Sequence, residues 1–166
     1  MSSGPHPKGP HSVVALGGGH GLAASLSALR RVVDDLTAVV TVADNGGSSG
    51  RLRNELGVLP PGDLRQALAA LCDDDEWGST WAQVLQHRFE SSGELHHHAV
   101  GNVLIVALWE LLGEHVAGLE WVARLLGAKG RVLPMTAVPL DITARVAGVH
   151  PDDPSRLETV RGQVEV

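Results

Sequence analysis

The sequence predicts an α/β protein with a mostly parallel sheet, and three observations support this prediction. Short runs of aliphatic and β-branched residues alternate with amphipathic segments at helical spacing. The first two aliphatic runs both stop at a cluster of glycines. The composition, with 43% hydrophobic but only 3% aromatic residues, is typical of the aliphatic interior of such proteins. A chain of 166 residues is long enough to bury one core of this kind.

The first element is a strand over residues 12–16, which ends in the glycine-rich turn 17–21. Leucines at helical spacing follow directly and predict a helix over residues 22–33. Glycines at such a turn let the backbone approach a ligand, and free N–H groups at the helix start attract anions. The turn is neither a dinucleotide fingerprint nor a P-loop, because Leu22 replaces a required glycine and no Gly-Lys-Ser/Thr follows. The alternative is a turn whose glycines are needed only for its backbone conformation and which binds no ligand.

A second buried strand is expected over residues 36–42, followed by a glycine-rich loop over residues 43–50. With the helix between them, the two strands form one right-handed β-α-β unit, so both glycine-rich segments lie at the same edge of a parallel sheet. The second loop adds an acid, an amide and two hydroxyls, and it leads into Arg51 and Arg53, which can clamp a phosphate. A solvent-exposed loop with a turn-forming Asn-Gly pair is the alternative.

Helical patterns dominate residues 62–126. Asp63 and Gln66 resemble a capping box, so Asp63 is interpreted as the N-cap of the first of these helices. Arg65 lies in the first turn, where a cation opposes the helix dipole unless it has an anionic partner, and it is therefore a candidate for ligand contact. Further helices are expected over residues 81–89, 101–112 and 114–126.

Three consecutive histidines, His96, His97 and His98, precede the helix over residues 101–112. Consecutive residues do not converge easily on one ion, and no Cys or acidic partner stands at zinc-like spacing, so we predict no metal site. His98 and Asn102 differ, because their i, i+4 spacing can point both side chains into one cleft. Short strands complete the expected elements, over residues 131–133, 140–146 and 160–166.

Charge and composition limit the classes of partner and location. The net charge of −6 and the scarcity of aromatic residues argue against a nucleic-acid partner. No apolar run approaches the roughly 20 residues that a membrane span needs. Residues 1–11 are rich in Ser, Gly, Pro and His without an apolar core, so we expect a disordered tail and no signal peptide. Cys72 is the single cysteine, which precludes an internal disulfide and fits the cytoplasm.

Four motifs together resemble the YvcK-like family of gluconeogenesis factors, which is part of the CofD-like superfamily. The motifs are residues 17–22, 43–53, 59–65 and 98–102, and their order and spacing are those of the family. The resemblance extends over residues 13–166, and His20 together with the tryptophan-containing segment 73–89 is similar to the actinobacterial branch. Family members are considerably longer than this chain. The resemblance therefore implies that residues 12–166 are the N-terminal part of a nucleotide-sugar-binding domain, with a truncated sheet.

The resemblance implies a Rossmann-like three-layer sandwich with a mostly parallel sheet, in a cytoplasmic protein. It also implies a UDP-sugar ligand, UDP-N-acetylglucosamine first of all, with no further cofactor. The function it implies is regulation of cell shape and cell-wall synthesis on gluconeogenic carbon sources. The enzymatic alternative is a CofD-like 2-phospholactate transferase of coenzyme F420 biosynthesis, which we rank second because no nucleophile–base pair stands out. A purely structural or interaction domain is a third hypothesis, and self-association is left open.

The candidate ligand-binding residues come from these motifs: Gly17, Gly18, Gly19, His20, Gly21, Asp44, Asn45, Gly46, Gly47, Ser48, Ser49, Arg51, Asp63, Arg65, His98 and Asn102. The resemblance implies that the turn 17–21 takes the diphosphate and that Asp44 faces the ligand. Asn45 stands where the family usually has a second aspartate, which argues against a metal at that point. Because a second glycine-rich loop of the family is not in this chain, we expect the 166-residue chain alone to bind a nucleotide sugar weakly or not at all.

Overall fold

The computed structural model describes residues 12–150 and 152–162. The predicted tail, residues 1–11, and the end of the last predicted strand, residues 163–166, lie outside the described residues. The described elements, in chain order, are β1 (Ser12–Gly17), α1 (Gly19–Leu29), β2 (Asp35–Val40), α2 (Gly47–Leu56), α3 (Gly62–Leu71), α4 (Glu76–Gln86), α5 (Val100–Leu112), α6 (His115–Leu126), β3 (Arg131–Pro134), β4 (Thr143–Val146) and β5 (Glu158–Arg161). The α/β class is confirmed.

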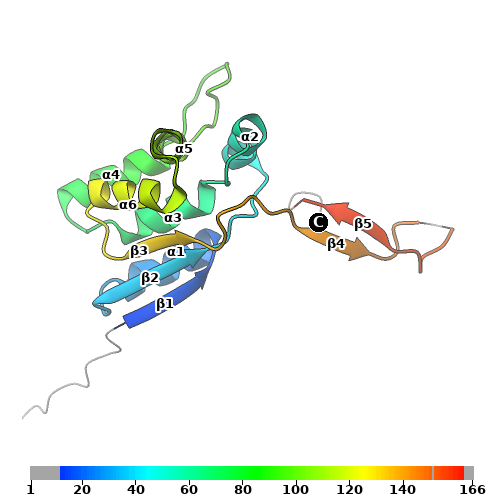
Figure 1. Cartoon of the computed structure of the whole chain (residues 1–166), viewed down its shortest axis with the longest axis horizontal. Coiled ribbons are helices and arrows are strands. Elements are labelled where there is room, and N and C mark those ends of the chain that lie inside the picture. Colours follow the sequence, from blue (N-terminus) through cyan, green and yellow to red (C-terminus); the bar gives the residue numbers. More distant parts are fainter. Residues whose placement is uncertain (1–11, 151, 163–166) are drawn as a thin grey trace, which may run out of the picture.

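The main sheet has three parallel strands in the order β1-β2-β3, as predicted for the first two. The chain passes from β1 to β2 and from β2 to β3, each time to the neighbouring strand on the same side. Right-handed crossovers therefore put the helices of both connections on one face of the sheet. Helices α1, α3 and α6 contact the strands on that face, and α3 to α6 gather on one side of the sheet in Figure 1. The carboxyl ends of all three strands therefore meet at one edge.

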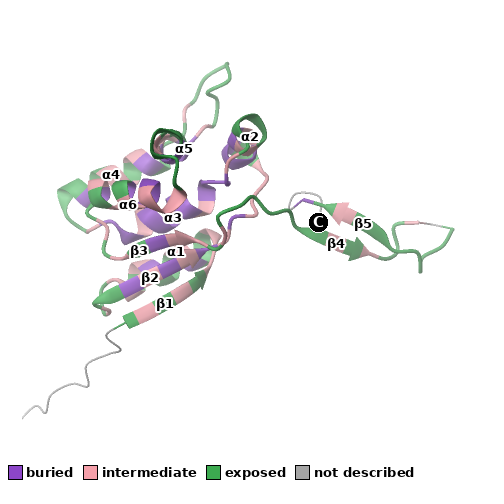
Figure 2. Ribbon diagram, viewed as in Figure 1, coloured by how far each residue is buried: buried purple, intermediate pink, exposed green. Residues whose placement is uncertain are grey.

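The hydrophobic core lies between the sheet and these helices, where Figure 2 shows the buried segments. Ala38 and Val40 of β2 are fully buried, as are Leu26 of α1, Leu68 of α3 and Leu126 of α6. Each fully buried large aliphatic side chain contributes about 2 kcal/mol of hydrophobic stabilisation. This core holds the helix starts and strand ends that form the candidate site in a fixed arrangement.

The opposite face of the sheet is exposed in the described part of the chain. Val14 and Leu16 alternate with inward-facing residues of β1 and are 60% and 75% exposed. Parallel sheets are ordinarily covered on both faces. The described residues thus supply two layers of the expected three-layer sandwich, and a third layer would lie against Val14 and Leu16.

Strands β4 and β5 form a separate antiparallel hairpin that extends away from the body in Figure 1. An isolated two-stranded hairpin is only marginally stable in water. Arg53 of α2 contacts Asp141 at the base of the hairpin, with Nη2 2.5 Å from Oδ1, and this ion pair joins the hairpin to the body. The predicted strand over residues 140–146 is present only as the shorter β4.

Two element predictions are wrong. Residues 43–50 were expected to be a loop, but α2 begins at Gly47, where the Gly50 N–H donates to the Gly46 carbonyl and closes a helical turn. The helix expected over residues 81–89 begins earlier, as α4, because Asp75 caps it by accepting from the Gly78 N–H at 2.7 Å. It also ends earlier, because Arg88 pairs with Ala99 in a β-bridge.

Candidate functional site

The first glycine-rich turn joins β1 to α1 at the carboxyl edge of the sheet. Gly17 and Gly19 have φ values of 151° and 59°, which residues with a side chain rarely adopt. Gly18 is the N-cap of α1 and gives the helix start no side-chain hydrogen bond. A Cβ at Gly18 would overlap Thr41 Oγ1 and Asp63 Oδ2. Gly18 is therefore needed for the close approach of this turn to the end of β2 and the start of α3.

Asp63 connects the turn, the strand end and α3. Thr41 Oγ1 donates to Asp63 Oδ2 at 3.1 Å, and the Gly19 N–H donates to the same carboxylate. The prediction that Asp63 caps α3 is wrong: Pro61 is the N-cap, so Asp63 lies inside the first turn and its carboxylate reaches the start of α1. Burial raises the pKa of Asp63, and the neighbouring Asp44 charge raises it further, against the effect of the hydrogen bonds.

The second turn places Asp44 beside Asp63. Asp44 Oδ1 accepts the Gly46 N–H at 2.8 Å, which holds the carboxylate against the start of α2. A Cβ at Gly62 would overlap Ser49 Oγ and lie 3.3 Å from Asp44 Oδ2, so Asp44 also lies over the start of α3. Two carboxylates from different motifs thus meet at the carboxyl edge, as the β-α-β arrangement predicts.

The strand ends border a hollow of about 360 Å³. Its lining residues are Thr41, Ala43, Asp44, Asp63, Met135, Leu140, Asp141 and Ile142. The carboxylates lie together with the apolar side chains of Leu140 and Ile142, so the hollow combines hydrogen-bond acceptors with an apolar surface. Thr41 and the residues after β3 are not among the candidates that the sequence motifs predict. Their positions at the ends of β2 and β3 were the available signal, because ligands of open α/β sheets bind at that edge.

A buried polar network links α2, α3 and α5 beneath the turns. Ser48 Oγ lies 3.0 Å from His98 Nδ1 and accepts from Asn102 Nδ2 at 3.1 Å. Asn102 Oδ1 accepts from Arg65 Nε at 2.9 Å, and Asn102 Nδ2 also reaches Ser49 Oγ at 3.5 Å. The network brings together five candidate residues that are far apart in the sequence.

The donors around Ser48 determine where the protons lie. Its oxygen accepts from the Ala99 N–H at 3.3 Å and from Asn102 Nδ2, two groups that can only donate. The hydroxyl proton is therefore donated to His98 Nδ1, and His98 is the neutral tautomer with its proton on Nε2. Burial lowers the pKa of His98, and the charge of Arg51 acts in the same direction. Ser48 thus forms a hydroxyl–imidazole pair with His98, but it is buried and does not line the hollow at the strand ends.

Arg65 is the cation of the network and is only 3% exposed. Burial lowers its pKa to about 10, the charge of Arg88 adds to the effect, and Asp63 opposes it. Its Nη1 is buried and has no hydrogen-bond partner among the described residues. A Cβ at Gly101 would lie 2.8 Å from Arg65 Cγ and from Leu85 Cγ, so Gly101 makes room for the guanidinium stem. A buried N–H donor without an acceptor is energetically costly, so an anionic group that accepts from Arg65 Nη1 would be favourable.

The remaining candidate residues lie at the periphery of the site. Arg51 donates to the Glu94 carbonyl at 3.0 Å and to the His96 carbonyl at 2.5 Å, so it holds the histidine loop against α2. Asn45 lies against Gly162, where a Cβ would overlap its Nδ2. His20, Gly21 and Gly47 are exposed at the starts of α1 and α2. In residues 12–150 and 152–162, no group of three His, Cys, Asp or Glu side chains is arranged for a metal ion.

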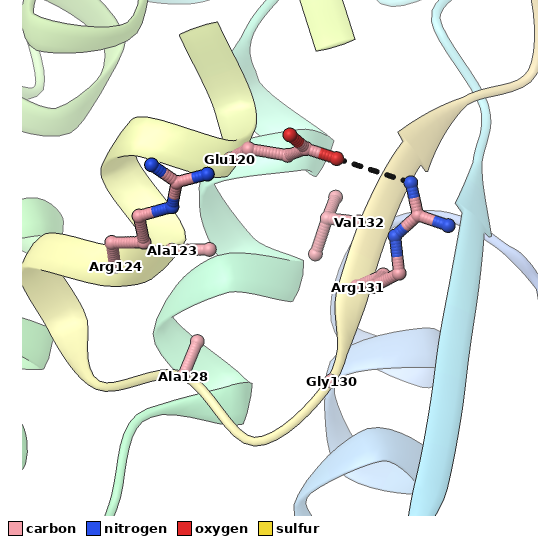
Figure 3. A pocket seen from close by; sticks show the side chains of 7 residues that line it. All are labelled: Glu120, Ala123, Arg124, Ala128, Gly130, Arg131 and Val132. Atoms are coloured by element: carbon pink, nitrogen blue, oxygen red, sulfur yellow. Dashed lines mark hydrogen bonds and ion pairs between the residues drawn. The ribbon is translucent and has the colours of Figure 1, made fainter. Parts of the chain in front are cut away.

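A hollow of about 290 Å³ lies at the other end of the sheet, between α6 and the amino end of β3 (Figure 3). Arg131 and Glu120 form an ion pair of 3.1 Å at its rim. None of the candidate residues lines this hollow. The sheet's carboxyl edge is therefore the place where the predicted residues gather.

The CofD family, described as 2-phospho-L-lactate transferase CofD, matches residues 13–166. The chain belongs to the CofD family. The match includes both glycine-rich turns and every residue of the buried network. The membership agrees with the resemblance that the four motifs carry.

Relatives of this CofD-family chain in two mycobacteria are named "Putative gluconeogenesis factor". The protein of Mycobacterium leprae (strain TN) is 56% identical over 160 residues, which cover 96% of this chain and 44% of the relative. That of Mycobacterium tuberculosis is 57% identical over 154 residues, covering 93% of this chain and 45% of the relative. A crystal structure of a Bacillus halodurans protein superimposes with a TM-score of 0.78 at 36% identity, covering 93% of this chain and 47% of that one.

The chain thus spans less than half the length of these relatives. The resemblance to gluconeogenesis factors of the CofD superfamily and the α/β fold class are confirmed. None of the helices within residues 12–150 and 152–162 has the length and apolar character needed to cross a membrane.

Proposed function

We propose that the protein of which this CofD-family chain is a part binds a UDP-sugar, UDP-N-acetylglucosamine first of all, at the carboxyl edge of the sheet. In this proposal the protein is a cytoplasmic regulator of cell shape and cell-wall synthesis on gluconeogenic carbon sources, and it does not catalyse a reaction. The observation that supports the binding proposal is the hollow lined by Asp44 and Asp63 beside two glycine-rich helix starts. The relatives' name, gluconeogenesis factor, supports the metabolic role.

The chemistry of the hollow suits a nucleoside diphosphate. Carboxylates accept hydrogen bonds from ribose hydroxyls and base N–H groups, and Leu140 and Ile142 offer an apolar surface to the base. Asp63 and Asp44 accept the Gly19 and Gly46 N–H groups, and the N–H groups that follow at the starts of α1 and α2 suit a diphosphate. The buried charge of Arg65 opposes the negative potential of the carboxylates.

Titration of the isotope-labelled chain with UDP-N-acetylglucosamine, followed by amide chemical shifts, tests the binding proposal. We expect weak binding at millimolar ligand, with shifts at residues 18–21 and 46–48, because the chain spans less than half of its relatives. UDP should cause the same shifts, whereas free N-acetylglucosamine should not, because it lacks the diphosphate. Asp44→Ala should abolish the shifts, and Asp152→Ala, which removes an exposed acid in the hairpin, should not. Shifts confined to the hollow of Figure 3 would contradict the proposal.

The second candidate is a 2-phospholactate transferase, which the description of the family favours. Ser48 and His98 form a hydroxyl–imidazole pair, but Ser48 is buried and does not line the hollow, so it offers no accessible nucleophile there. Direct transfer between two bound substrates needs no such nucleophile. Formation of a phospholactyl-deazaflavin product by the protein would favour the transferase over the regulator. Loss of ligand binding in Asp44→Ala of the full-length protein, with the fold intact, would exclude a purely structural role.

A further inference from the structure

The tryptophan-containing helix α4 carries a feature that the site at the sheet edge does not use. Trp77 and Trp81 lie one turn apart, with ring centroids 5.7 Å apart and ring planes inclined by 50°. Trp77 is 55% exposed, yet its Nε1 donates to the Leu125 carbonyl at 2.9 Å, which fixes the indole against α6. The two rings therefore form an aromatic corner that is held in place before any partner arrives.

The aromatic corner borders a surface hollow of about 570 Å³. Its lining residues are Asp75, Glu76, Trp77, Thr80, Trp81 and Val84. The lining contains two carboxylates and no basic side chain. Asp75 is occupied in capping α4, but Glu76 has no hydrogen-bond or ion-pair partner in the described part of the chain. The hollow therefore combines negative charge, two indole surfaces and an apolar floor.

Among the described residues, the neighbouring charges do not compensate the negative charge of Glu76. The preceding acids are paired: Asp73 Oδ1 lies 2.9 Å from Lys129 Nζ, and Asp74 contacts Arg30. On the neighbouring helix, the exposed indole of Trp121 has its own cation, since the guanidinium carbon of Arg124 lies 5.1 Å from the ring centroid. In the residues that the structure describes, the aromatic corner has no such cation.

We propose that this hollow binds an arginine side chain presented by a partner protein. A guanidinium is attracted by the faces of indole rings and stacks on them, while Glu76 and Asp75 accept its N–H groups. The methylene stem of an arginine packs on Val84 and Trp81. A nucleic acid or an anionic membrane would be repelled by the same carboxylates, so the charge of the hollow favours a basic polypeptide segment.

A peptide titration of the whole chain tests this proposal. The probe is a blocked Gly-Arg-Gly peptide, and the matched control peptide has citrulline in place of arginine, which keeps the shape and removes the charge. The readout is the set of indole N–H resonances, assigned with single Trp→Phe variants. We expect the arginine peptide to shift the resonances of Trp77 and Trp81 and to leave that of Trp109, which is buried, unchanged. Equal shifts with the citrulline peptide, or no shifts with either, would overturn the proposal.

Substitutions of exposed residues inside and outside the hollow separate an effect on peptide binding from an effect on folding. Glu76→Gln changes one exposed charge, and we expect it to weaken binding of the arginine peptide about fivefold, an effect that added salt should reduce. Glu110→Gln makes the same change at an exposed position of α5 outside the hollow and should leave affinity unchanged. An equal loss in the two variants would show a general charge effect and would also overturn the proposal. UDP-N-acetylglucosamine should not compete, so this test is separate from that of the sheet edge.

Discussion

Each of the two glycine-rich segments follows one of two adjacent parallel strands, yet the two segments fold differently. In residues 17–21 a short turn leads into α1 at Gly19, and His20 and Gly21 of its first turn are exposed. The carboxylate at this helix start comes from Asp63 of another helix. The second segment turns inward as α2, and Ser48, Ser49 and Gly50 are buried. The difference lies in the side chains: hydroxyls can join a network with α5, whereas the first segment offers mainly glycine. Glycine content alone therefore does not distinguish a turn open to a ligand from a buried helix start.

The largest expected effect comes from breaking the network beneath the second segment. Asn102→Ala removes the acceptor of Arg65 Nε and a donor to Ser48. The buried guanidinium of Arg65 then lacks the hydrogen bond that its Nε makes. We expect a loss of about 3 kcal/mol in the free energy of unfolding, measured by urea denaturation. Asn54→Ala, at an exposed position of α2, is the control and should cost a few tenths of a kcal/mol at most. A loss at Asn102 no larger than at Asn54 would show that the network adds no stability.

A matched pair of glycine substitutions compares the two segments directly. A Cβ at Gly50 would overlap the Asn45 carbonyl oxygen, a backbone atom that cannot rotate away, so Gly50→Ala should cost about 2 kcal/mol. A Cβ at Gly21 meets no atom within 4 Å, and Gly21→Ala should stabilise α1 by about 0.5 kcal/mol, because alanine has the higher helix propensity. Thermal unfolding of both variants measures the difference. Similar effects at the two positions would mean that the segments are packed alike.

Thr41→Val tests how firmly the first turn is held. The substitution keeps the shape but removes the hydroxyl that donates to Asp63 Oδ2, and we expect a loss of about 1 kcal/mol at neutral pH in urea denaturation. Thr37→Val makes the same change on β2 at a hydroxyl with no hydrogen bond among the described residues, so it should be neutral or slightly stabilising. If both variants behave alike, the Thr41–Asp63 bond does not contribute to stability.

The smallest effect concerns the protonation of His98. Its pKa is lowered by burial, so the unfolded chain binds a proton more readily than the folded protein between that lowered pKa and the ordinary value of about 6.5. Stability should therefore rise with pH across this window and fall as the pH drops through it, since protonation puts a donor where Ser48 already donates. The measurement is the pH dependence of urea unfolding, with His98→Gln as the variant that lacks this contribution.

Asp63 contributes the opposite slope at a lower pH. Because its pKa is raised in the folded state, the stability it contributes is lost as the pH rises from its ordinary value of 3.8 through the raised one. Asp63 contributes equally to the parent chain and to His98→Gln, so the difference between the two isolates the histidine. A difference that does not change with pH below 6.5 would contradict the assigned tautomer.

Local sequence patterns were sufficient to predict the order of β1, α1 and β2, the core helices α3, α5 and α6, and the family. These features follow from periodicity and from motifs within short stretches, because a helix or a strand must bury the apolar side chains that recur along it. The positions of Asp44 and of the glycine turn at one sheet edge followed as well, because the handedness of the β-α-β crossover leaves one arrangement.

The side-chain contacts of the site required the folded structure. It showed that Asp63 reaches the start of α1 instead of capping α3, that Ser48 orients the imidazole of His98, and that Thr41 and Asp141 belong to the hollow. Each of these depends on residues tens of positions apart, whose contact is set by how helices pack on the sheet. Local patterns contain no record of that packing, because hydrogen bonds between distant polar side chains impose no period on the sequence.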